Sequence, residues 1–462
     1  MAQQAVAEVQ AVDLPRDFDL LEMHVRHPER YPFLLESVAT GADGRQPAEA
    51  HDILFASPGE TLRMDSAFRV HRAQGLKGAG FLRALDEWWR DSHVATDPDL
   101  SLPFHGGWFL FLGYELAGEI EPSIRVLDPP EGPVAFATRI PVALVRNRQT
   151  GRGWIVAEPG HDDAIAELRR DLASCASMPR RLARAGRLVT GICEPDPGEF
   201  LAAVGQIRRL ITRGDVYQVN LARRWQASVS AGVIPADIYR ELRRTNPAPC
   251  AGIAKLGDWA LISSSPERLV RSRGGVVETR PIAGTRPTAV HPSLDDAQRR
   301  ELLANPKERA EHVMLIDLER NDLGRISEPG SVEVTEFMVV ESYAHVHHIV
   351  SNIRGRLRPD VSPGDLIRAL FPGGTITGCP KVRCMEIISE LEPVPRGPYT
   401  GSMGYLNRDG SCDLNILIRS FVMRGRELSF AAGGGIVADS DPERELEETR
   451  AKAKGLLLAL GD

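Results

Sequence analysis

The 462-residue sequence lacks a long apolar run and lacks the pattern of a secretory signal. A segment that crosses a bilayer needs about 18 or more consecutive apolar residues, and stretches such as residues 108–112 and 456–460 are far shorter. Residues 1–4 show neither the basic region of a signal peptide nor the apolar region that follows it. We therefore expect no membrane partner and a cytoplasmic location.

The sequence also lacks an excess of positive charge. Lys and Arg number 56 against 63 Asp and Glu, which gives a formal net charge of −7. Domains that bind nucleic acids and segments that bind anionic membranes carry clustered Lys and Arg, so neither partner is expected. With 42% hydrophobic and 26% charged residues, the composition is that of a globular protein large enough to bury an extensive core.

The six cysteines show no C-x-x-C pair and no metal-ligand spacing. A disulfide framework is not expected in a large cytoplasmic protein. We predict reduced thiols that are mostly buried.

No internal repeat or low-complexity segment is present, and three regions differ in pattern. Residues 15–158 alternate short apolar strands with turns, and residues 159–197 are rich in Arg and Ala, as in a connection. Residues 198–461 mix strands and helices without strict alternation. This pattern predicts an α+β fold with antiparallel sheets rather than a doubly wound parallel sheet.

The element predictions are most specific in the third region. A helix over residues 200–211 ends near Gly214, and a strand over residues 215–224 places Gln218 and Asn220 on one face. That face is either an outward polar face or part of a site. Further strands are predicted at residues 258–264, 275–281, 331–340, 346–355, 401–406, 415–423 and 427–432, and further helices at residues 306–323, 364–370, 380–391 and 442–460.

Two of these helices carry stacked carboxylates. Glu308 and Glu311 share a stripe with apolar residues of the helix at 306–323, and Glu445, Glu448 and Lys452 share a stripe of the last helix. Carboxylates that face an interior need a compensating cation, and Mg²⁺ prefers oxygen ligands. Surface helices with Glu–Lys pairs are the alternative interpretation.

Two glycine-rich segments, residues 371–381 and 433–435, could let an anion approach the backbone. The first leads into a helix that begins near Lys381, but its order does not match a Walker A loop. Ordinary turns would also explain both segments. Together with Arg419, predicted to lie on a strand, they favour a small ligand with more than one carboxylate.

Seven segments of the chain resemble the family of chorismate-utilising enzymes, which includes anthranilate synthase component I, aminodeoxychorismate synthase component I, and the isochorismate and salicylate synthases. These segments are residues 214–221, 264–268, 280–285, 307–312, 347–351, 371–383 and 432–440. The resemblance implies two antiparallel sheets packed face to face with helices outside. It also implies an N-terminal region (15–158) that supplies strands to both sheets, a connection (159–197) and a chorismate-binding catalytic region (198–461).

The resemblance also implies a role for individual residues. Glu311 and Glu448 would ligate Mg²⁺, with Glu308 and Glu445 supporting them through water. Glu267 matches the acid that protonates the departing C4 hydroxyl of chorismate. The other matches at the site are His348 beside the ring, Gln218 and Thr285 as further catalytic residues, and Thr375, Gly378, Tyr399, Arg419, Gly434, Gly435 and Lys452 as substrate contacts.

Near the N-terminus, Leu35, Glu36 and Ser37 resemble the tryptophan-binding segment of anthranilate synthase. In that branch of the family the segment serves feedback inhibition. The alternative interpretation is the end of a buried strand.

Within the family, Gln218 favours amination. Isochorismate and salicylate synthases carry a Lys there that activates water, and an amide cannot act as a base. Ammonia would come from a separate glutamine amidotransferase subunit, since nothing in the chain resembles one. Every carboxylate of the family pattern is present, which disfavours a non-catalytic subunit.

Two aminating branches remain. Residues 217–220, 246–249, 265–268, 371–378 and 432–435 resemble aminodeoxychorismate synthase, which serves p-aminobenzoate and folate synthesis. Ala283 disagrees, because that branch commonly has a Lys there whose amine attacks ring C2. Residues 281–285 have the form found in anthranilate synthase, which serves tryptophan synthesis. We expect aminodeoxychorismate synthase, with anthranilate synthase as the alternative.

Overall fold

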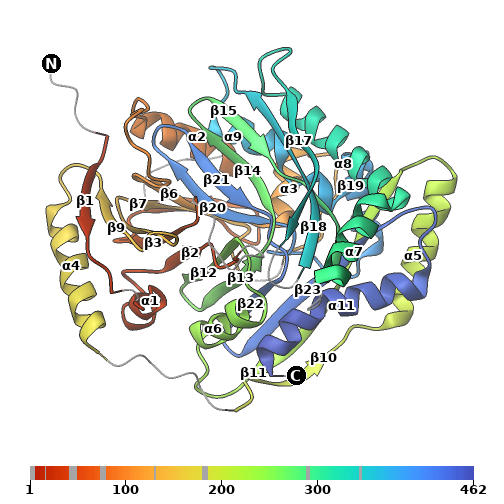
Figure 1. Ribbon diagram of the computed structural model, residues 1–462, viewed down its shortest axis with the longest axis horizontal. Coiled ribbons are helices and arrows are strands. Elements are labelled where there is room, and N and C mark those ends of the chain that lie inside the picture. Colours follow the sequence, from red (N-terminus) through yellow and green to blue (C-terminus); the bar gives the residue numbers. More distant parts are fainter. Residues whose placement is uncertain are drawn as a thin grey trace.

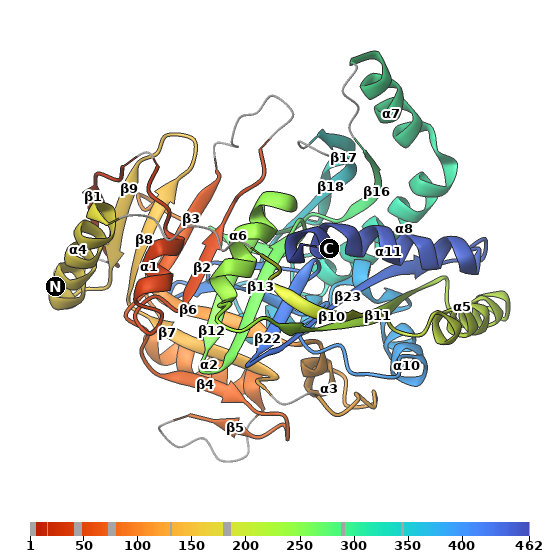
Figure 2. The ribbon, with the colours of Figure 1, turned by 90° about the horizontal axis from the view of Figure 1, so that it is seen from below.

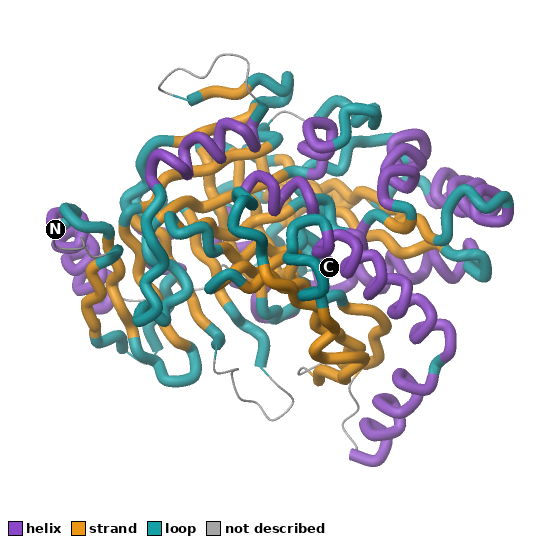
Figure 3. The backbone as a smooth tube through the Cα atoms, turned by 90° about the horizontal axis from the view of Figure 1, so that it is seen from above, coloured by secondary structure: helices purple, strands orange, loops and turns teal. Residues whose placement is uncertain are grey.

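Two antiparallel β-sheets lie at the centre of the molecule and helices cover their outer faces (Figures 1 and 3). The computed structural model describes residues 6–15, 17–40, 49–72, 80–129, 132–178, 186–287, 292–342 and 346–461. Every strand pairing within these residues is antiparallel. The α+β fold predicted from the sequence is confirmed.

The first sheet runs from the N-terminal strand to the strand that follows the connection. Its strands, in spatial order, are β1 (Glu8–Val12), β9 (Gly153–Ala157), β8 (Val142–Asn147), β3 (His51–Ala56), β2 (Phe33–Glu36), β12 (Cys250–Leu256), β13 (Trp259–Ser265), β22 (Ser420–Arg424), β23 (Glu427–Ile436), β11 (Gln218–Val229) and β10 (Val189–Cys193), with β19 (Gly378–Cys379) paired to β11.

The second sheet also draws on both ends of the chain. Its strands are β16 (Ile282–Pro287), β18 (Val346–Arg356), β15 (Val276–Thr279), β14 (Arg268–Arg273), β21 (Cys412–Asn415), β20 (Ser402–Asn407), β6 (Gly107–Leu112), β7 (Ala135–Ile140), β4 (Thr61–Met64) and β5 (Val70–His71), with β17 (Glu333–Ser342) paired to β18. Strands before residue 158 therefore enter both sheets, as the family resemblance implies.

Aromatic rings hold the two sheets together. Phe33 of the first sheet stacks on Phe109 of the second, with ring centroids 4.1 Å apart and planes inclined by 5°. Phe111 of the second sheet lies 4.9 Å from the ring of Trp259 in the first. These side chains are buried, so the sheets share an apolar core between their inner faces.

Helices cover the outer faces of the sheets (Figure 2). They bury apolar residues against those faces. The first sheet is covered by α1 (Leu21–Arg26), α4 (Asp162–Ser177), α6 (Pro235–Thr245) and α11 (Pro442–Leu460), and the second by α2 (Phe81–Ser92), α8 (Pro306–Gly324) and α9 (Pro363–Leu370). A separate apolar cluster joins β11 and β23 to α3 (Ala117–Ile120), α5 (Pro197–Thr212) and α10 (Lys381–Leu391). The remaining helices are α7 (Pro292–Ala304) and the 3₁₀ turns η1 (Tyr114–Leu116) and η2 (Gly374–Ile376). None of the helices in the described ranges is long and apolar enough to cross a membrane.

The segment interpreted as a connection contributes ordered structure. It contains α4, whose Asp171 accepts a hydrogen bond of 2.8 Å from the Tyr31 hydroxyl. It also contains β10, which pairs with β11 at the edge of the first sheet. All six cysteines are free thiols. Cys175, Cys384 and Cys412 are buried and Cys193 is exposed, so the prediction of mostly buried thiols holds for three of the six.

The two long carboxylate-bearing helices form where they were predicted. Both α8 and α11 begin at a proline, whose fixed φ suits the first helical position. The continuous strand predicted at residues 415–423 is wrong, because β21 ends at Asn415 and β22 begins at Ser420. Ile416 and Leu417 are buried, so their apolar side chains give the sequence pattern of a strand. Arg419 was predicted to lie on this strand, but it lies outside it, with φ of 51°.

We predict that Phe109→Ala lowers the free energy of unfolding by about 3–5 kcal/mol, the usual cost of removing a buried Phe side chain. The Phe109 ring contacts aromatic residues of both sheets. The loss of stability should therefore appear as a single shift of the midpoint of urea unfolding. Phe337→Ala on β17 is the control, because Phe337 is 55% exposed and should change stability by less than about 0.5 kcal/mol. Equal shifts in the two variants would contradict the shared core.

Candidate active site

The predicted site residues gather where the chain twice crosses from one sheet to the other. Glu267 lies between β13 of the first sheet and β14 of the second, and Arg419 lies between β21 of the second and β22 of the first. The two crossings are joined, because the backbone N–H of Ile416 donates to the carbonyl of Glu267 at 3.0 Å. An acid and a cation are therefore held at the junction of the sheets.

The polar face of β11 forms one wall of the site. Gln218 and Asn220 are buried, with 2% and 7% of their surface exposed, so the outward-facing interpretation is wrong. Asn220 lies opposite Gly435 of β23. A side chain at position 435 would collide with the Gln218 amide unless that amide moved, so Gly435 lets Gln218 pack directly against β23. Among the described residues, the buried Oε1 of Gln218 has no hydrogen-bond partner.

Helix α11 brings its polar side chains to β23. A Cβ atom at Gly434 would lie 3.4 Å from Oε1 of Glu448, 3.6 Å from Oε2 of Glu445 and 3.7 Å from Nζ of Lys452. The Lys452 ammonium donates to the carbonyl of Gly433 at 3.0 Å and lies 2.8 Å from Glu448. Gly434, Glu445, Glu448 and Lys452 are thus brought together.

Helix α8 supplies the other pair of predicted metal ligands. Oε1 of Glu311 accepts a hydrogen bond of 3.1 Å from the Gln218 amide, which places Glu311 at the β11 wall. Oε2 of Glu308 would lie 2.9 Å from a Cβ at Gly284, so Glu308 faces β16. Glu311 thus reaches β11 from α8, whereas Glu445 and Glu448 reach β23 from α11.

The residues present suit Mg²⁺ by their chemistry. Four carboxylates on α8 and α11 offer oxygen donors, which Mg²⁺ prefers, and the orphaned Oε1 of Gln218 adds a further acceptor. In the described part of the chain, no three His, Cys, Asp or Glu side chains are already grouped to hold a metal. The Glu448 side chain is 48% exposed and paired with Lys452, so the prediction that it faces an interior is wrong.

Glu267 has the environment of a buried acid. It is 5% exposed, and its Oε1 accepts a hydrogen bond of 2.8 Å from the Thr375 hydroxyl. Burial raises the pKa of Glu267 to about 7, while the Thr375 hydroxyl, the backbone N–H of Ile282, Lys452 and Arg419 oppose that rise. At neutral pH this carboxyl therefore exists in both forms and can donate a proton.

The other polar groups of the site have defined protonation states or partners. Burial lowers the pKa of His348 to about 4, so its imidazole is neutral at pH 7. Burial also lowers the pKa of Arg419, which Glu267 opposes, and Nη1 of Arg419 donates to Oδ1 of Asn246 at 3.4 Å. The Tyr399 hydroxyl would lie 2.9 Å from a Cβ at Gly433, and burial raises the pKa of Tyr399.

Two predicted residues are placed by their backbone. Thr285 lies opposite His348 in the β16–β18 pairing, and its side chain is outside the described residues. Gly378 pairs with Val219, and a side chain at position 378 would collide with the carbonyl of Gln218. Gly378 therefore allows β19 to pair closely with β11.

Lys381 is not available to the loop that was interpreted as an anion site. Its ammonium pairs with Asp322 of α8 and donates to the carbonyl of Leu370 at 3.3 Å. The glycine-rich segment at residues 371–381 is thus tied to α8. Its contribution to the site is Thr375, whose hydroxyl contacts Glu267 rather than open solvent.

Sequence reasoning missed two buried charged residues near the site. Glu319 of α8 accepts a hydrogen bond of 3.1 Å from the Thr279 hydroxyl, and burial raises its pKa to about 7. Glu319 lies eight residues after Glu311, so the two side chains share one face of α8. This spacing could have identified Glu319 from the sequence. Arg396, which follows α10, forms hydrogen bonds to several site elements.

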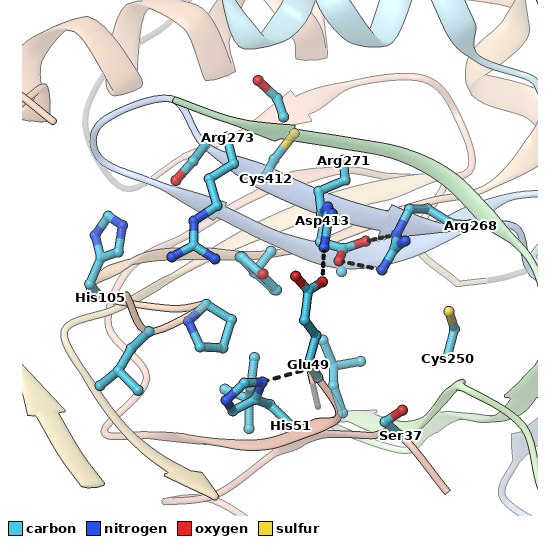
Figure 4. Close-up of a pocket in the computed structure, with 18 of the residues that line it drawn as sticks. Ser37, Glu49, His51, His105, Cys250, Arg268, Arg271, Arg273, Cys412 and Asp413 are labelled. Carbon is cyan, nitrogen blue, oxygen red and sulfur yellow. Dashed lines mark hydrogen bonds and ion pairs between the residues drawn. The ribbon is translucent and has the colours of Figure 1, made fainter. Parts of the chain in front are cut away.

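The segment of Leu35, Glu36 and Ser37 lines a cavity of about 500 Å³, whose described lining does not include the predicted catalytic or metal-binding residues. Figure 4 shows Arg268, Arg271 and Arg273 around this cavity, with Arg268 paired to Asp413 at 2.9 Å. The Glu36 carboxylate is fully buried and paired with Arg148 and Arg243 at 2.7 and 3.0 Å. Because Arg268 follows Glu267 directly, the cavity and the candidate active site share one stretch of chain.

Comparisons with known proteins agree with this arrangement. The family model for chorismate binding enzymes matches residues 42–458. Aminodeoxychorismate synthase component 1 of Bacillus subtilis is 41% identical over 390 residues, which are 82% of this chain and 82% of that protein. Anthranilate synthase component 1 of Streptomyces coelicolor is 38% identical over 473 residues, which are 97% and 91% of the two chains.

A solved structure supports the same conclusion. Anthranilate synthase component I from Streptococcus pneumoniae aligns with a TM-score of 0.78 at 32% identity, covering 88% of this chain and 92% of that one. The fold expected from the family resemblance is therefore confirmed.

We predict that Glu267→Gln stabilises the folded protein at pH 8 but not near pH 4.5. The pKa of Glu267 is about 7 in the folded state, against an ordinary value of 4.5. The wild type therefore loses stability as pH rises from about 4.5 to about 7, and Gln removes this loss. The measurement is Tm against pH for both proteins.

A second variant checks the cause. Thr375→Val removes a hydrogen bond that lowers the pKa of Glu267 in the folded protein. When Thr375→Val is compared with the double variant that also carries Glu267→Gln, the Tm difference should therefore keep growing up to a higher pH. A Tm difference independent of pH would contradict the assignment.

Proposed function

The chain belongs to the family of chorismate-binding enzymes, and from this premise we propose that it is aminodeoxychorismate synthase component I. It would convert chorismate and ammonia to 4-amino-4-deoxychorismate, for p-aminobenzoate and folate synthesis. The observation that carries an acid-assisted displacement is the buried Glu267 carboxyl, with its pKa raised to about 7 and Thr375 at 2.8 Å. A group in this state can turn a departing hydroxyl into water.

Several residues would orient the substrate. Lys452 and Arg419 supply cations for its carboxylates, and a guanidinium can bind a carboxylate with two hydrogen bonds. Gly434 leaves room for close approach to β23 beside Glu448 and Lys452. Mg²⁺, held by Glu311 and Glu448 with Glu308 and Glu445 behind them, would polarise the ring carboxylate.

Proton movement then completes the reaction. Glu267 gives its proton to the C4 hydroxyl, the C4–O bond breaks, and water leaves. The nitrogen of ammonia forms the new bond to C4, and one of its protons returns to the Glu267 carboxylate. Chorismate and ammonia thus give the amino product and water, and Glu267 ends protonated. The neutral His348 would lie beside the ring, and the Gln218 amide cannot act as a base for water.

A glutamine amidotransferase subunit is the proposed source of ammonia. The similar proteins of Bacillus subtilis and Streptomyces coelicolor are both called component 1, a name that implies a second component.

The alternative is anthranilate synthase component I, and Ala283 is the observation that favours it. Ala283 is buried in β16. It follows Ile282, whose backbone N–H donates a hydrogen bond to the Glu267 carboxylate. It offers no amine to attack ring C2, so the proposed route requires direct attack of ammonia at C4. Attack at C2 would give 2-amino-2-deoxyisochorismate, and loss of pyruvate would give anthranilate. Inhibition by micromolar tryptophan, abolished in Ser37→Arg, would support this alternative.

The deciding measurement is a product assay with chorismate, ammonium and Mg²⁺. We expect p-aminobenzoate to form only when the pyridoxal-phosphate lyase that acts on aminodeoxychorismate is added. Mass spectrometry during turnover should find no covalent adduct, since Ala283 has no nucleophile. Anthranilate fluorescence without added lyase would overturn the proposal in favour of the alternative.

Metal dependence provides a further prediction. Glu311→Gln and Glu448→Gln should each fold but lose turnover, because each removes a charge from a site whose Mg²⁺ affinity depends on charge count. Glu447→Gln is the matched control, since Glu447 is adjacent on α11 and pairs with Arg450 at 2.6 Å. Chorismate consumption is measured against Mg²⁺ concentration. Retained activity in both Glu311→Gln and Glu448→Gln would refute these ligands.

A further inference from the structure

Arg396 uses every N–H donor of its guanidinium within the protein interior. Nε donates to Oε2 of Glu392 at 2.8 Å, and Nη2 donates to Oε1 of Glu392 at 2.6 Å and to the carbonyl of Asn220 at 2.8 Å. Nη1 donates to the carbonyl of Ile376 at 3.0 Å and to the Thr400 hydroxyl at 3.2 Å. A guanidinium has five N–H groups, so none is left over.

The three acceptors other than Glu392 are each next to a residue of the candidate active site. Ile376 directly follows Thr375, Asn220 lies opposite Gly435 in β23, and Thr400 directly follows Tyr399. The guanidinium carbon also lies 5.7 Å from the centre of the Tyr399 ring. One side chain therefore connects the segment that holds the acid, the strand that lines the site and the tyrosine expected to contact substrate.

Glu392 makes this burial possible. Arg396 is 5% exposed and Glu392 is 7% exposed, and an unpaired charge at that depth would be strongly destabilising. Oε1 of Glu392 also accepts from the backbone N–H of Ala222 at 2.9 Å, which adds a second bond to β11. A buried ion pair is often no more stabilising than apolar residues of the same volume. What this pair provides is fixed geometry among three segments.

On the basis of the proposed function, we propose that Arg396, held by Glu392, is a positioning residue that keeps Thr375 on Glu267 and keeps Tyr399 against β23. It does not touch the reacting atoms. Its effect on the reaction would pass through the Thr375–Glu267 hydrogen bond and through the Tyr399 hydroxyl near Gly433.

The test uses Arg396→Lys, which keeps the charge but offers three donors from a single nitrogen. Displacement of Ile376 would weaken the hydrogen bond from Thr375 to Glu267, and losing that bond raises the pKa of Glu267. We expect kcat for ammonia-dependent chorismate consumption to fall by about tenfold or more. The pH at which kcat/KM falls with increasing pH should move upward. Glu392→Gln should move both quantities in the same direction, which keeps the test valid if Arg396→Lys fails to fold.

Arg146→Lys on β8 is the matched control. Arg146 is likewise ion-paired, to Asp52 at 2.6 Å, with its side chain 13% exposed, but it lies in the N-terminal half of the first sheet. It should lose stability while kcat and the pH profile stay unchanged. If Arg396→Lys and Glu392→Gln behave like this control, Arg396 is merely structural and the inference is overturned.

A second readout separates this inference from the proposed function. Tm is measured against pH for Arg396→Lys with and without Glu267→Gln, and the difference between the two curves reports the titration of Glu267. The midpoint of this difference should lie at higher pH than in the wild-type background. The measurement needs no turnover, so it tests the positioning role even if the chain does not consume chorismate. An unchanged midpoint would contradict the role.

Discussion

The burial of the Glu267 carboxyl is the constraint on which the rest of the site depends. A carboxyl exposed to water would have given up its proton well below neutral pH, and burial alone would hold the proton too tightly. Thr375, the N–H of Ile282 and the cations of Lys452 and Arg419 oppose the effect of burial. The pKa of about 7 is therefore a balance between desolvation and groups from separate elements.

The two-sheet architecture brings these groups together. Glu267 and Arg419 occupy short crossings between the sheets, where the backbone is free of regular strand geometry and can aim a side chain at the junction. The left-handed backbone of Arg419, with φ of 51°, is one result. The aromatic core of Phe33 and Phe109 packs between the two sheets, so apolar contacts help to hold the sheets that the crossings connect.

Sequence patterns predicted the parts of this arrangement that depend on local rules. Prolines at the first helical position marked α8 and α11, and the spacing of Glu308 with Glu311 and of Glu445 with Glu448 identified the carboxylate faces. The break at residues 416–419 was missed, because a buried apolar run reads as a strand whether or not it crosses between sheets. Arg396 could not be found this way, since its acceptors include Asn220 and Ile376, which are distant in the sequence.

The same balance explains how an acid with its pKa near neutrality could serve a dianionic substrate. Arg419 and Lys452 lower the pKa of Glu267 in the free protein, and they are also the cations expected to bind the substrate carboxylates. A bound dianion would offset their charge, so the proton of Glu267 would be held more firmly in the complex than in the free protein. The acid would then be protonated when the hydroxyl has to leave. Arg419 and Lys452 would then have two linked roles, binding the substrate and adjusting the acid, and replacing either would change both.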